Sequence, residues 1–320
     1  MKLAVFSPVF GNTDLESALK FLSERGVDGL ELGAGGCPGK AHADILELKK
    51  SASKREELLN LFKKYNMEIC ALSVHNNPVH PQKAVAKIAD EELDAAIEVA
   101  PKLGVDRIIT FSGCPGDGKG DMPNWVTCPW PNEFSQVLDY QWNEVLIPYW
   151  KKKAQAAKDN GVKICFEMHP GFCVYNPETL LKLRNAAGDS LGANLDPSHL
   201  IWQGIDIVSA IKALGDALYY FHAKDTAIDK ANTAVNGVLD TKPYTDEAHR
   251  SWIFRTVGYG SDEKVWKDIV SALRLTGYDG YLSIEHEDSL MTQTEGLEKA
   301  IAFMQRILIR QPKLGSAWWV

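Results

Sequence analysis

Eight short apolar runs alternate with amphipathic stretches along this chain. A run of this length is typical of a strand that is buried on both faces. The stretches between the runs repeat their apolar residues with the period of a helix. The pattern therefore predicts parallel strands joined by helices. The expected strands cover about residues 3–9, 29–33, 68–75, 107–112, 162–168, 191–196, 218–223 and 281–286.

Two of the expected helices carry a start signal. Thr13 with Glu16 three residues later predicts a capping box, and Ser53 with Glu56 predicts another. The apolar stripes are Leu15, Ala18, Leu19 and Leu22; Leu58, Leu61, Phe62 and Tyr65; Val265, Ile269 and Leu273; and Leu297, Ile301, Met304 and Leu308.

A glycine recurs between a helical stretch and the apolar run that follows it. It is found at Gly26, Gly104, Gly161 and Gly277. Glycine adopts the left-handed conformation that ends a helix, so each of these residues predicts a helix end. No GxGxxG motif follows the first strand, which argues against a dinucleotide-binding sheet.

Eight alternating units without a mid-chain linker predict an α/β fold, the (β/α)8 barrel. We expect residues 1–320 to form one domain with a C-terminal tail at 309–320. Two long connections, 113–137 and 226–261, leave strands four and seven and are rich in aromatic residues. Barrel enzymes build their sites at this end of the strands. The two loops are therefore expected either to shape a substrate pocket or lid, or to pack against a neighbouring subunit.

Four of the apolar runs end in a residue that can hold a metal ion. These residues are Glu167, Asp196, His222 and Glu285. The spacing places them at the same end of strands five to eight, and a buried acid there needs a cation to satisfy it. Three carboxylates and one imidazole predict one divalent metal ion, with Mn²⁺ first and Mg²⁺, Co²⁺ or Zn²⁺ as alternatives.

The same strand ends carry a family resemblance. Phe-Glu-Met-His at 166–169, Asn-Leu-Asp-Pro-Ser-His at 194–199, His-Ala-Lys-Asp at 222–225 and Ile-Glu at 284–285 resemble the signature strands of the xylose isomerase-like superfamily. This superfamily of sugar isomerases and epimerases includes ketose 3-epimerases, inosose isomerases and dehydratases, and endonuclease IV. C-glycoside deglycosidase subunits are similar to the same barrel.

The resemblance assigns roles to these residues. It implies that Glu167, Asp196, His222 and Glu285 are the metal ligands, and that Glu167 and Glu285 are also catalytic and exchange protons with the substrate. It implies that His199 contacts the sugar or lies close to the metal. The expected function is a metal-dependent isomerase or epimerase acting through an enediolate on a sugar, keto-sugar or inositol-like substrate.

Three other functions remain open. The first is a metal-dependent lyase or C-glycoside deglycosidase acting on a keto-glycoside. The second is a DNA repair enzyme similar to endonuclease IV, although Thr110-Phe111-Ser112 ends strand four without a histidine and the net charge of −7 disfavours nucleic acid. The third is a non-catalytic barrel subunit.

Further residues are expected at the pocket. His169 shares the strand parity of Glu167, and Lys224 shares that of His222, so each should face the metal site, although Lys224 is equally suited to an ion pair. His75, which ends strand three, and Glu31, which lies in strand two, are further pocket candidates. The ketose 3-epimerases carry a glutamate and an arginine at positions where 170–173 and 226–229 supply neither. Arg255 is the candidate replacement, so the substrate stays open.

Composition limits the partners. A charge of −7 argues against nucleic acid and an anionic membrane surface, and we expect a small carbohydrate substrate and a cytoplasmic protein. The six cysteines show no CxxC pair and are expected to be reduced. We also expect a homo-oligomer, or a hetero-oligomer if the protein is a deglycosidase subunit. The apolar segment 317–320 is expected to dock on the barrel or on a neighbouring subunit.

Overall fold

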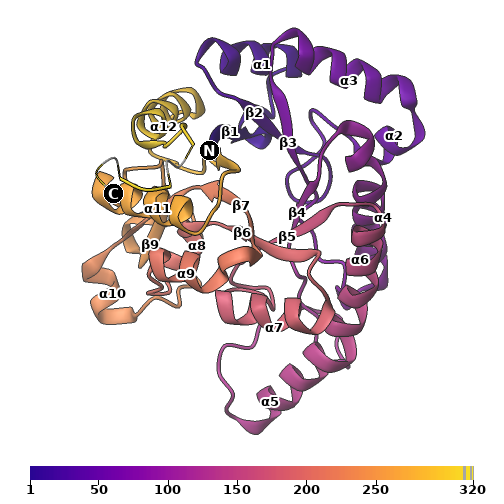
Figure 1. Ribbon diagram of the computed structural model, residues 1–320. Helices are drawn as coiled ribbons and strands as arrows, with labels where there is room; N and C mark the ends of the chain where they lie inside the picture. The colour runs from indigo at the N-terminus through magenta and orange to yellow at the C-terminus, as the bar shows by residue number, and fades with distance from the viewer. Residues whose placement is uncertain (313–314, 318, 320) are drawn as a thin grey trace.

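Eight parallel strands close into a barrel in the order β1-β10-β7-β6-β5-β4-β3-β2 (Figure 1). The computed structural model describes residues 1–312, 315–317 and 319. Every predicted strand is present, which confirms the α/β class and the (β/α)8 barrel. The strands are β1 (Lys2–Phe6), β2 (Gly29–Gly33), β3 (Glu68–Ser73), β4 (Arg107–Thr110), β5 (Lys163–Glu167), β6 (Leu191–Leu195), β7 (Leu218–Ala223) and β10 (Tyr281–Ile284).

Helices surround the barrel (Figure 1). They bury their apolar stripes, although Val265 is 40% exposed, so that part of the predicted third stripe is wrong. Figure 1 also shows α5 at the lower edge of the molecule, away from the strands. The helices are α1 (Leu15–Glu24), α2 (Ile45–Lys50), α3 (Ala52–Lys64), α4 (Lys83–Val99), α5 (Asn132–Asp139), α6 (Ile147–Asp159), α7 (Pro177–Ala187), α8 (Pro197–Ile201), α9 (Ile207–Leu214), α10 (Lys230–Asn236), α11 (Glu263–Leu275) and α12 (Gln293–Ile307).

Helix ends follow the glycine prediction, whereas two helix starts do not follow the capping prediction. Gly26, Gly104, Gly161 and Gly277 all have a positive φ, between 67° and 91°. The first helix is capped by Asp14, whose Oδ1 accepts from the Ser17 backbone N–H at 2.9 Å, and not by Thr13. The second predicted start, at Ser53, is also wrong, because Ser51 caps α3 through the Lys54 N–H at 3.2 Å.

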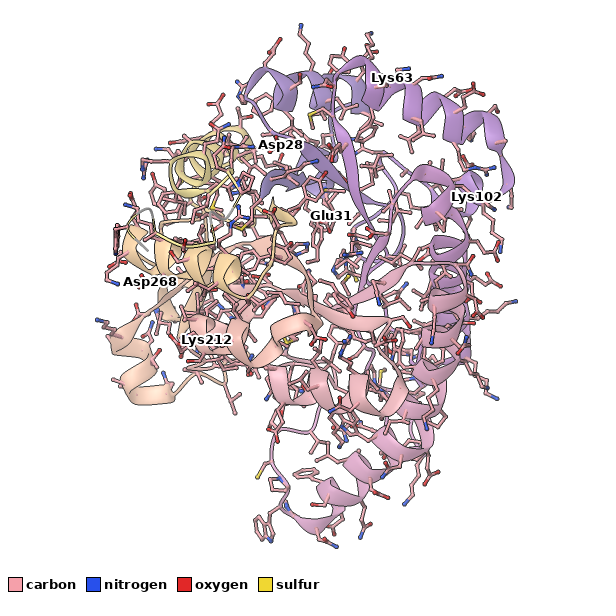
Figure 2. The ribbon with its side chains drawn as sticks, viewed as in Figure 1. Asp28, Glu31, Lys63, Lys102, Lys212 and Asp268 are labelled. Atoms are coloured by element: carbon pink, nitrogen blue, oxygen red, sulfur yellow. The ribbon has the colours of Figure 1, made fainter. Side chains whose placement is uncertain are left out.

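The inside of the barrel is divided into layers along the strands. The lower layer, toward the amino ends, is apolar and consists of Ala4, Cys70, Ala71, Ile109, Cys165 and Tyr220. The layer above it holds Glu31, Ser73, His222 and Ser283, all fully buried. Figure 2 shows Glu31 near the middle of the molecule, whereas Lys63 and Lys212 lie on outer helices. The interior therefore becomes polar toward the carboxyl ends of the strands.

The long connection after β7 has structure of its own. Strands β8 (Asp225–Ile228) and β9 (Trp252–Arg255) pair as an antiparallel ribbon with α10 between them. The buried carboxylate of Asp225 anchors this segment. Its Oδ2 accepts from the backbone N–H groups of Gly258, Gly260 and Ser261 and from Trp266 Nε1, at 2.9–3.2 Å. The ribbon is thereby fixed to α11 and to the top of the barrel.

Three remaining expectations concern the chain as a whole. All six cysteines are free thiols, as predicted. Among the described residues, no helix combines the length and the apolar character that crossing a bilayer requires. The predicted docking of segment 317–320 involves Trp318 and Val320, which lie outside the described residues.

Candidate metal centre

Four side chains from neighbouring strands converge at the carboxyl end of the barrel. Glu167 ends β5, Asp196 follows β6, His222 lies in β7 and Glu285 follows β10. One ligand atom from each lies within 4.8 Å of the other three. His222 Nδ1 is 3.0 Å from Glu285 Oε2 and 3.2 Å from Glu167 Oε2. The four side chains therefore lie together, as the sequence predicts.

Three facing atoms of this group have no hydrogen-bond partner among the described residues. Asp196 Oδ2, His222 Nδ1 and Glu285 Oε2 are buried and make no hydrogen bond to the described residues. Leaving such acceptors unsatisfied away from water is costly. Three carboxylates and one imidazole suit Mn²⁺, Mg²⁺, Co²⁺ or Zn²⁺. The donor set therefore fits one divalent metal ion.

Glu31 sets the orientation of His222 from below. His222 Nε2 lies 3.0 Å from both carboxylate oxygens of Glu31, and the hydroxyls of Ser73 and Ser283 also donate to this carboxylate. A carboxylate only accepts, so Nε2 carries a hydrogen, and Nδ1 faces Glu167 and Glu285. This is the arrangement by which a second carboxylate orients a metal-binding histidine.

Two further imidazoles hold Glu167. His199 Nε2 donates to Glu167 Oε1 and His75 Nε2 donates to Oε2, both at 3.0 Å. Burial, followed by the influence of His169, lowers the pKa of His199 to about 3, so this ring is neutral. Although burial opposes it, the hydrogen bonds from His199, His222 and His75 lower the pKa of Glu167 well below its usual value. Glu167 is thus ionised and fixed in place.

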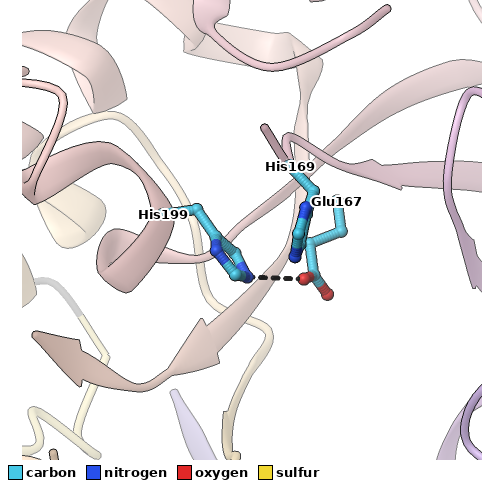
Figure 3. A group of neighbouring side chains, drawn as sticks. All are labelled: Glu167, His169 and His199. Carbon is cyan, nitrogen blue, oxygen red and sulfur yellow. Dashed lines mark hydrogen bonds and ion pairs between the residues drawn. The ribbon is translucent and has the colours of Figure 1, made fainter. Parts of the chain in front are cut away.

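His169 lies beside this pair (Figure 3). Its Nδ1 donates to the Pro170 carbonyl at 2.6 Å, which leaves Nε2 free of that bond. Its ring centroid is 4.0 Å from that of His199. Glu167, His169 and His199 also offer ligand atoms within 4.8 Å of one another. His169 therefore belongs to the upper wall of the same group.

Lys224 is a buried ammonium between the carboxylates. Its Nζ is 2.7 Å from Glu287 Oε2, 3.4 Å from Glu285 Oε1 and 3.5 Å from Asp196 Oδ2. Burial opposes ionisation, but the carboxylates of Glu285, Glu287 and Asp196 raise the pKa of Lys224 well above its usual value. Lys224 is therefore charged at neutral pH.

The two acids beside Lys224 respond in opposite ways. Burial raises the pKa of Glu285, but Lys224 more than offsets it, and the pKa falls to about 2. Burial raises the pKa of Asp196 to about 8, opposed by Lys224 and reinforced by Glu285 and Glu167. Asp196 therefore holds a proton at neutral pH in the metal-free chain.

A cavity of about 250 Å³ opens above these residues. Its walls include Glu167, Glu285, Lys224, His75, His169 and His199. A larger cavity of about 760 Å³ lies at the opposite end of the barrel, between helix ends and strand starts such as Gly26 and Glu68, and includes none of the predicted site residues. The predicted site residues therefore gather at the carboxyl end, the end at which barrel enzymes build their sites.

Of the predicted site residues, Asp196, His222, Arg255 and Glu31 do not line this cavity, whereas the others do. Arg255 lies on β9, where its guanidinium is 3.3 Å from Asp288 Oδ1 and 3.7 Å from Glu247 Oε2, and it does not line the cavity. Glu31 was expected in the pocket but lies beneath His222. Glu287 was not predicted, although it shares the strand parity of Glu285 and gives Lys224 its shortest ion pair.

Comparisons with known proteins agree with this fold. Residues 19–307 match the family model described as the xylose isomerase-like TIM barrel. The chain is 40% identical over 312 residues to an uncharacterised protein, YfiH, of Bacillus subtilis, which covers 96% of this chain and 99% of that protein. It is also 27% identical over 152 residues to an inosose dehydratase of Clostridium perfringens, which covers 47% of this chain and 49% of that protein.

One solved structure with a similar fold contains a metal ion. The crystal structure of the IolI protein with a zinc atom aligns with a TM-score of 0.66 and 19% identity, over 96% of this chain and 98% of that chain. At this identity the likeness shows the fold alone. The family match covers most of the chain, and the geometry of the four strand ends accords with it. The chain therefore belongs to the xylose isomerase-like TIM barrel family.

Proposed function

We propose that this protein is a divalent-metal-dependent isomerase or epimerase that acts on a sugar, keto-sugar or inositol-like substrate. The observation that carries the proposal is the convergence of Glu167, Asp196, His222 and Glu285, three of which point a buried atom without a hydrogen-bond partner among the described residues at the others. In this proposal these four residues hold the ion, with Mn²⁺ as the first candidate. The family match supports an enzyme of carbohydrate chemistry.

A bound divalent cation would polarise adjacent carbonyl and hydroxyl oxygens of the substrate and stabilise the enediolate. The two glutamates do the proton transfer. Glu167 and Glu285 both line the cavity and are ionised at neutral pH, which is the form that accepts a proton. One carboxylate removes the proton next to the carbonyl, and the other returns a proton to the same or the adjacent carbon.

The surrounding residues hold these two bases in place. His199 and His75 fix both oxygens of Glu167, and Lys224 lies against Glu285 Oε1. Each base is therefore held by more than one contact, which reduces the reorganisation needed when a proton moves. Lys224 and His169 also face the cavity and are proposed to bind substrate oxygens.

Deuterium exchange tests the proposal. The protein is stripped of metal, reloaded with Mn²⁺ and incubated in heavy water with a panel of ketoses, inososes and keto-glycosides. We expect deuterium to enter next to the carbonyl of at least one substrate, only when metal is present. E167Q and E285Q should abolish the exchange, whereas E56Q, an exposed glutamate on α3, should retain it. Absence of metal-dependent exchange across the panel would refute the proposal.

A metal-dependent lyase is the second candidate. The inosose dehydratase relative spans about half of this chain, and a dehydratase begins with the same abstraction of a proton next to a carbonyl. The same incubation separates the two functions. Loss of a hydroxyl or release of an aglycone indicates the lyase, and an interconverted sugar of unchanged composition indicates the isomerase.

A further inference from the structure

Carboxylates outnumber cations in the wall of the metal cavity. Glu167, Glu285 and Glu287 line it, and an oxygen of Asp196 lies within 4.8 Å of the first two. Among the described residues that line the cavity, Lys224 is the only lysine or arginine. A divalent ion and this ammonium together would carry three positive charges against four carboxylates. The cavity therefore stays negative even when a metal ion is bound.

The ammonium of Lys224 is already shared among carboxylates. Its shortest ion pair, at 2.7 Å, is to Glu287, and Glu285 and Asp196 follow at 3.4 and 3.5 Å. The Lys224 side chain is 2% exposed, whereas that of Glu287 is 49% exposed, and both line the cavity. An anionic group that approached Lys224 would therefore also meet the more exposed carboxylate of Glu287, which repels it.

Two neighbouring cavities repeat this pattern of charge. They have volumes of about 380 and 420 Å³, and both share His169 with the metal cavity. Asp240 lines the first, and Glu247 and Glu287 line the second. No lysine or arginine is found among the described residues that line either of them. A ligand that extends beyond the metal cavity therefore meets acidic side chains there as well.

Three basic side chains next to these cavities are engaged within the protein. Lys242 Nζ lies 2.9 Å from Asp240 Oδ1. Arg250 donates from Nε to the Trp252 carbonyl at 3.2 Å and from Nη1 to the carbonyl of Lys242. The guanidinium of Arg255 lies between two carboxylates, as described above. Each of these cations is therefore already held by a partner in the chain.

Backbone N–H groups that could bind an anion are also occupied. Barrel enzymes often bind phosphate with the loops that follow strands seven and eight. In the loop after β7, the N–H groups of Gly258, Gly260 and Ser261 converge on one point, as they do in an anion-binding nest. That point is Asp225 Oδ2, which also accepts from Trp266 Nε1. A carboxylate of the chain itself therefore fills the nest.

We propose that Glu287 makes this pocket selective for uncharged carbohydrates, so that the substrate carries neither a phosphate nor a carboxylate group. The inference rests on the proposed function and narrows its substrate class. A sugar hydroxyl can accept from Lys224 and donate to Glu287 at the same time. A phosphate dianion or a carboxylate has no hydrogen to donate to Glu287 and is repelled by its charge.

Matched pairs of ligands test the selectivity. The Mn²⁺-loaded protein is titrated by calorimetry with fructose, tagatose, glucose and myo-inositol, each beside its phosphate ester, and titrations into Mn²⁺ alone correct for binding to the metal. We expect at least one neutral member to bind about tenfold or more tightly than its ester. The preference should shrink as NaCl is added, because salt screens the repulsion. An ester that binds as tightly as its neutral partner, or a panel in which no neutral member binds, overturns the inference.

The E287Q variant tests the residue that the proposal names. The substitution removes the charge and keeps the size of the side chain, so the preference for the neutral member should fall by about five- to tenfold. E56Q, which removes an exposed charge on α3, is the control and should keep the wild-type preference. Circular dichroism and Mn²⁺ binding check that both variants are folded. An unchanged preference in E287Q overturns the assignment to Glu287.

The outcomes separate the selectivity from the proposed function. Metal-dependent deuterium exchange in phosphorylated sugars, without exchange in neutral ones, overturns the selectivity and leaves the proposed function intact. A preference for neutral sugars that is reduced in E287Q, without exchange in any sugar, supports the selectivity and overturns the proposed function.

Discussion

Inside the barrel, the lower layer around Cys165 and Tyr220 contrasts with the upper layer around Glu167 and His222, although the same strands build both. Cys165 and Glu167 are two residues apart on β5, and Tyr220 and His222 are two residues apart on β7, which is about 7 Å along each strand. In the lower layer the Tyr220 hydroxyl meets Cys70 Sγ at 3.1 Å and the remaining surfaces are apolar. In the upper layer, acids and imidazoles face one another with unsatisfied atoms.

The residues that stabilise the barrel and the residues proposed for chemistry therefore lie in different layers along the strands. The lower layer needs no ligand, because its side chains satisfy one another. In the upper layer, burial raises the pKa of Asp196, and His222 Nδ1 has no hydrogen bond to the described residues, as the proposed cation site predicts. Natural proteins commonly give up stability at functional sites in this way. Substitutions in the two layers should therefore have separable effects.

The largest effect is expected from the upper layer. E167Q removes a proposed base and a metal ligand while keeping the size of the side chain. We expect the rate of metal-dependent deuterium exchange to fall by about 10²–10⁴-fold. E56Q, which changes an exposed glutamate in the same way, should retain the wild-type rate. Full exchange activity in E167Q would remove Glu167 from the chemistry.

The matching change in the lower layer is I109A. Ile109 is fully buried beneath the site, so its truncation should lower the free energy of unfolding by about 2–5 kcal/mol. Urea denaturation measures this loss, and calorimetry should find Mn²⁺ affinity unchanged. I88A is the control, since Ile88 is 56% exposed on α4. If I109A lost Mn²⁺ binding without losing stability, the division into two layers would be wrong.

Glu31 lies at the boundary between the layers. E31Q replaces a carboxylate that accepts from His222 Nε2 with an amide that also donates. Losing this orienting contact should weaken Mn²⁺ binding by about 10–100-fold, the usual effect of removing a partner of a metal-binding histidine. Calorimetric titration measures the affinity. Unchanged affinity would mean that the orientation of His222 does not depend on Glu31.

The smallest expected effect is a dependence on pH. The pKa of Asp196 is about 8 in the folded metal-free chain, against an ordinary value of 3.8. Between these values the folded chain binds the additional proton, so its stability from this group falls as pH rises. Mn²⁺ must displace that proton below pH 8, so its apparent affinity rises with pH, by up to about tenfold per unit.

Thermal unfolding measures this competition directly. The increase in Tm on adding Mn²⁺ should be larger at pH 8 than at pH 6. D196N, which has no proton to displace at this position, should bind Mn²⁺ weakly and show little dependence on pH. An equal or larger increase at pH 6 in the wild type would contradict the proposed proton competition.

The strands and the convergence of the four strand-end residues were predictable from the sequence because both depend on local pattern. An apolar run that ends in Glu167 or Glu285 identifies both a buried strand and the end at which its side chain lies. The residue that caps a helix was harder to predict, since Thr13 and Asp14 are both residue types that commonly cap helices. Asp14 is the cap because its carboxylate reaches the Ser17 N–H. Such competition is decided by geometry that residue type does not reveal.

Contacts across the closed barrel were beyond prediction from one sequence. Glu31 and His222 are 191 positions apart and meet only because strand parity and barrel closure point both side chains inward. The ribbon after β7 depends on Asp225, which the sequence analysis did not connect with Gly258 or Trp266. The pairing of Arg255 with Asp288 depends on the same loop geometry. Substrate specificity, which these loops shape, was therefore the least predictable feature.

The central claim is that the four strand ends form one divalent cation site. Calorimetric titration of the metal-stripped protein with Mn²⁺ tests it most directly, with D196N and H222Q as site variants and E56Q as the control. The account predicts one ion per chain in the wild type and in E56Q, and a large loss of affinity in both site variants. Absence of Mn²⁺ binding by the wild type, or undiminished binding by D196N and H222Q, would contradict it.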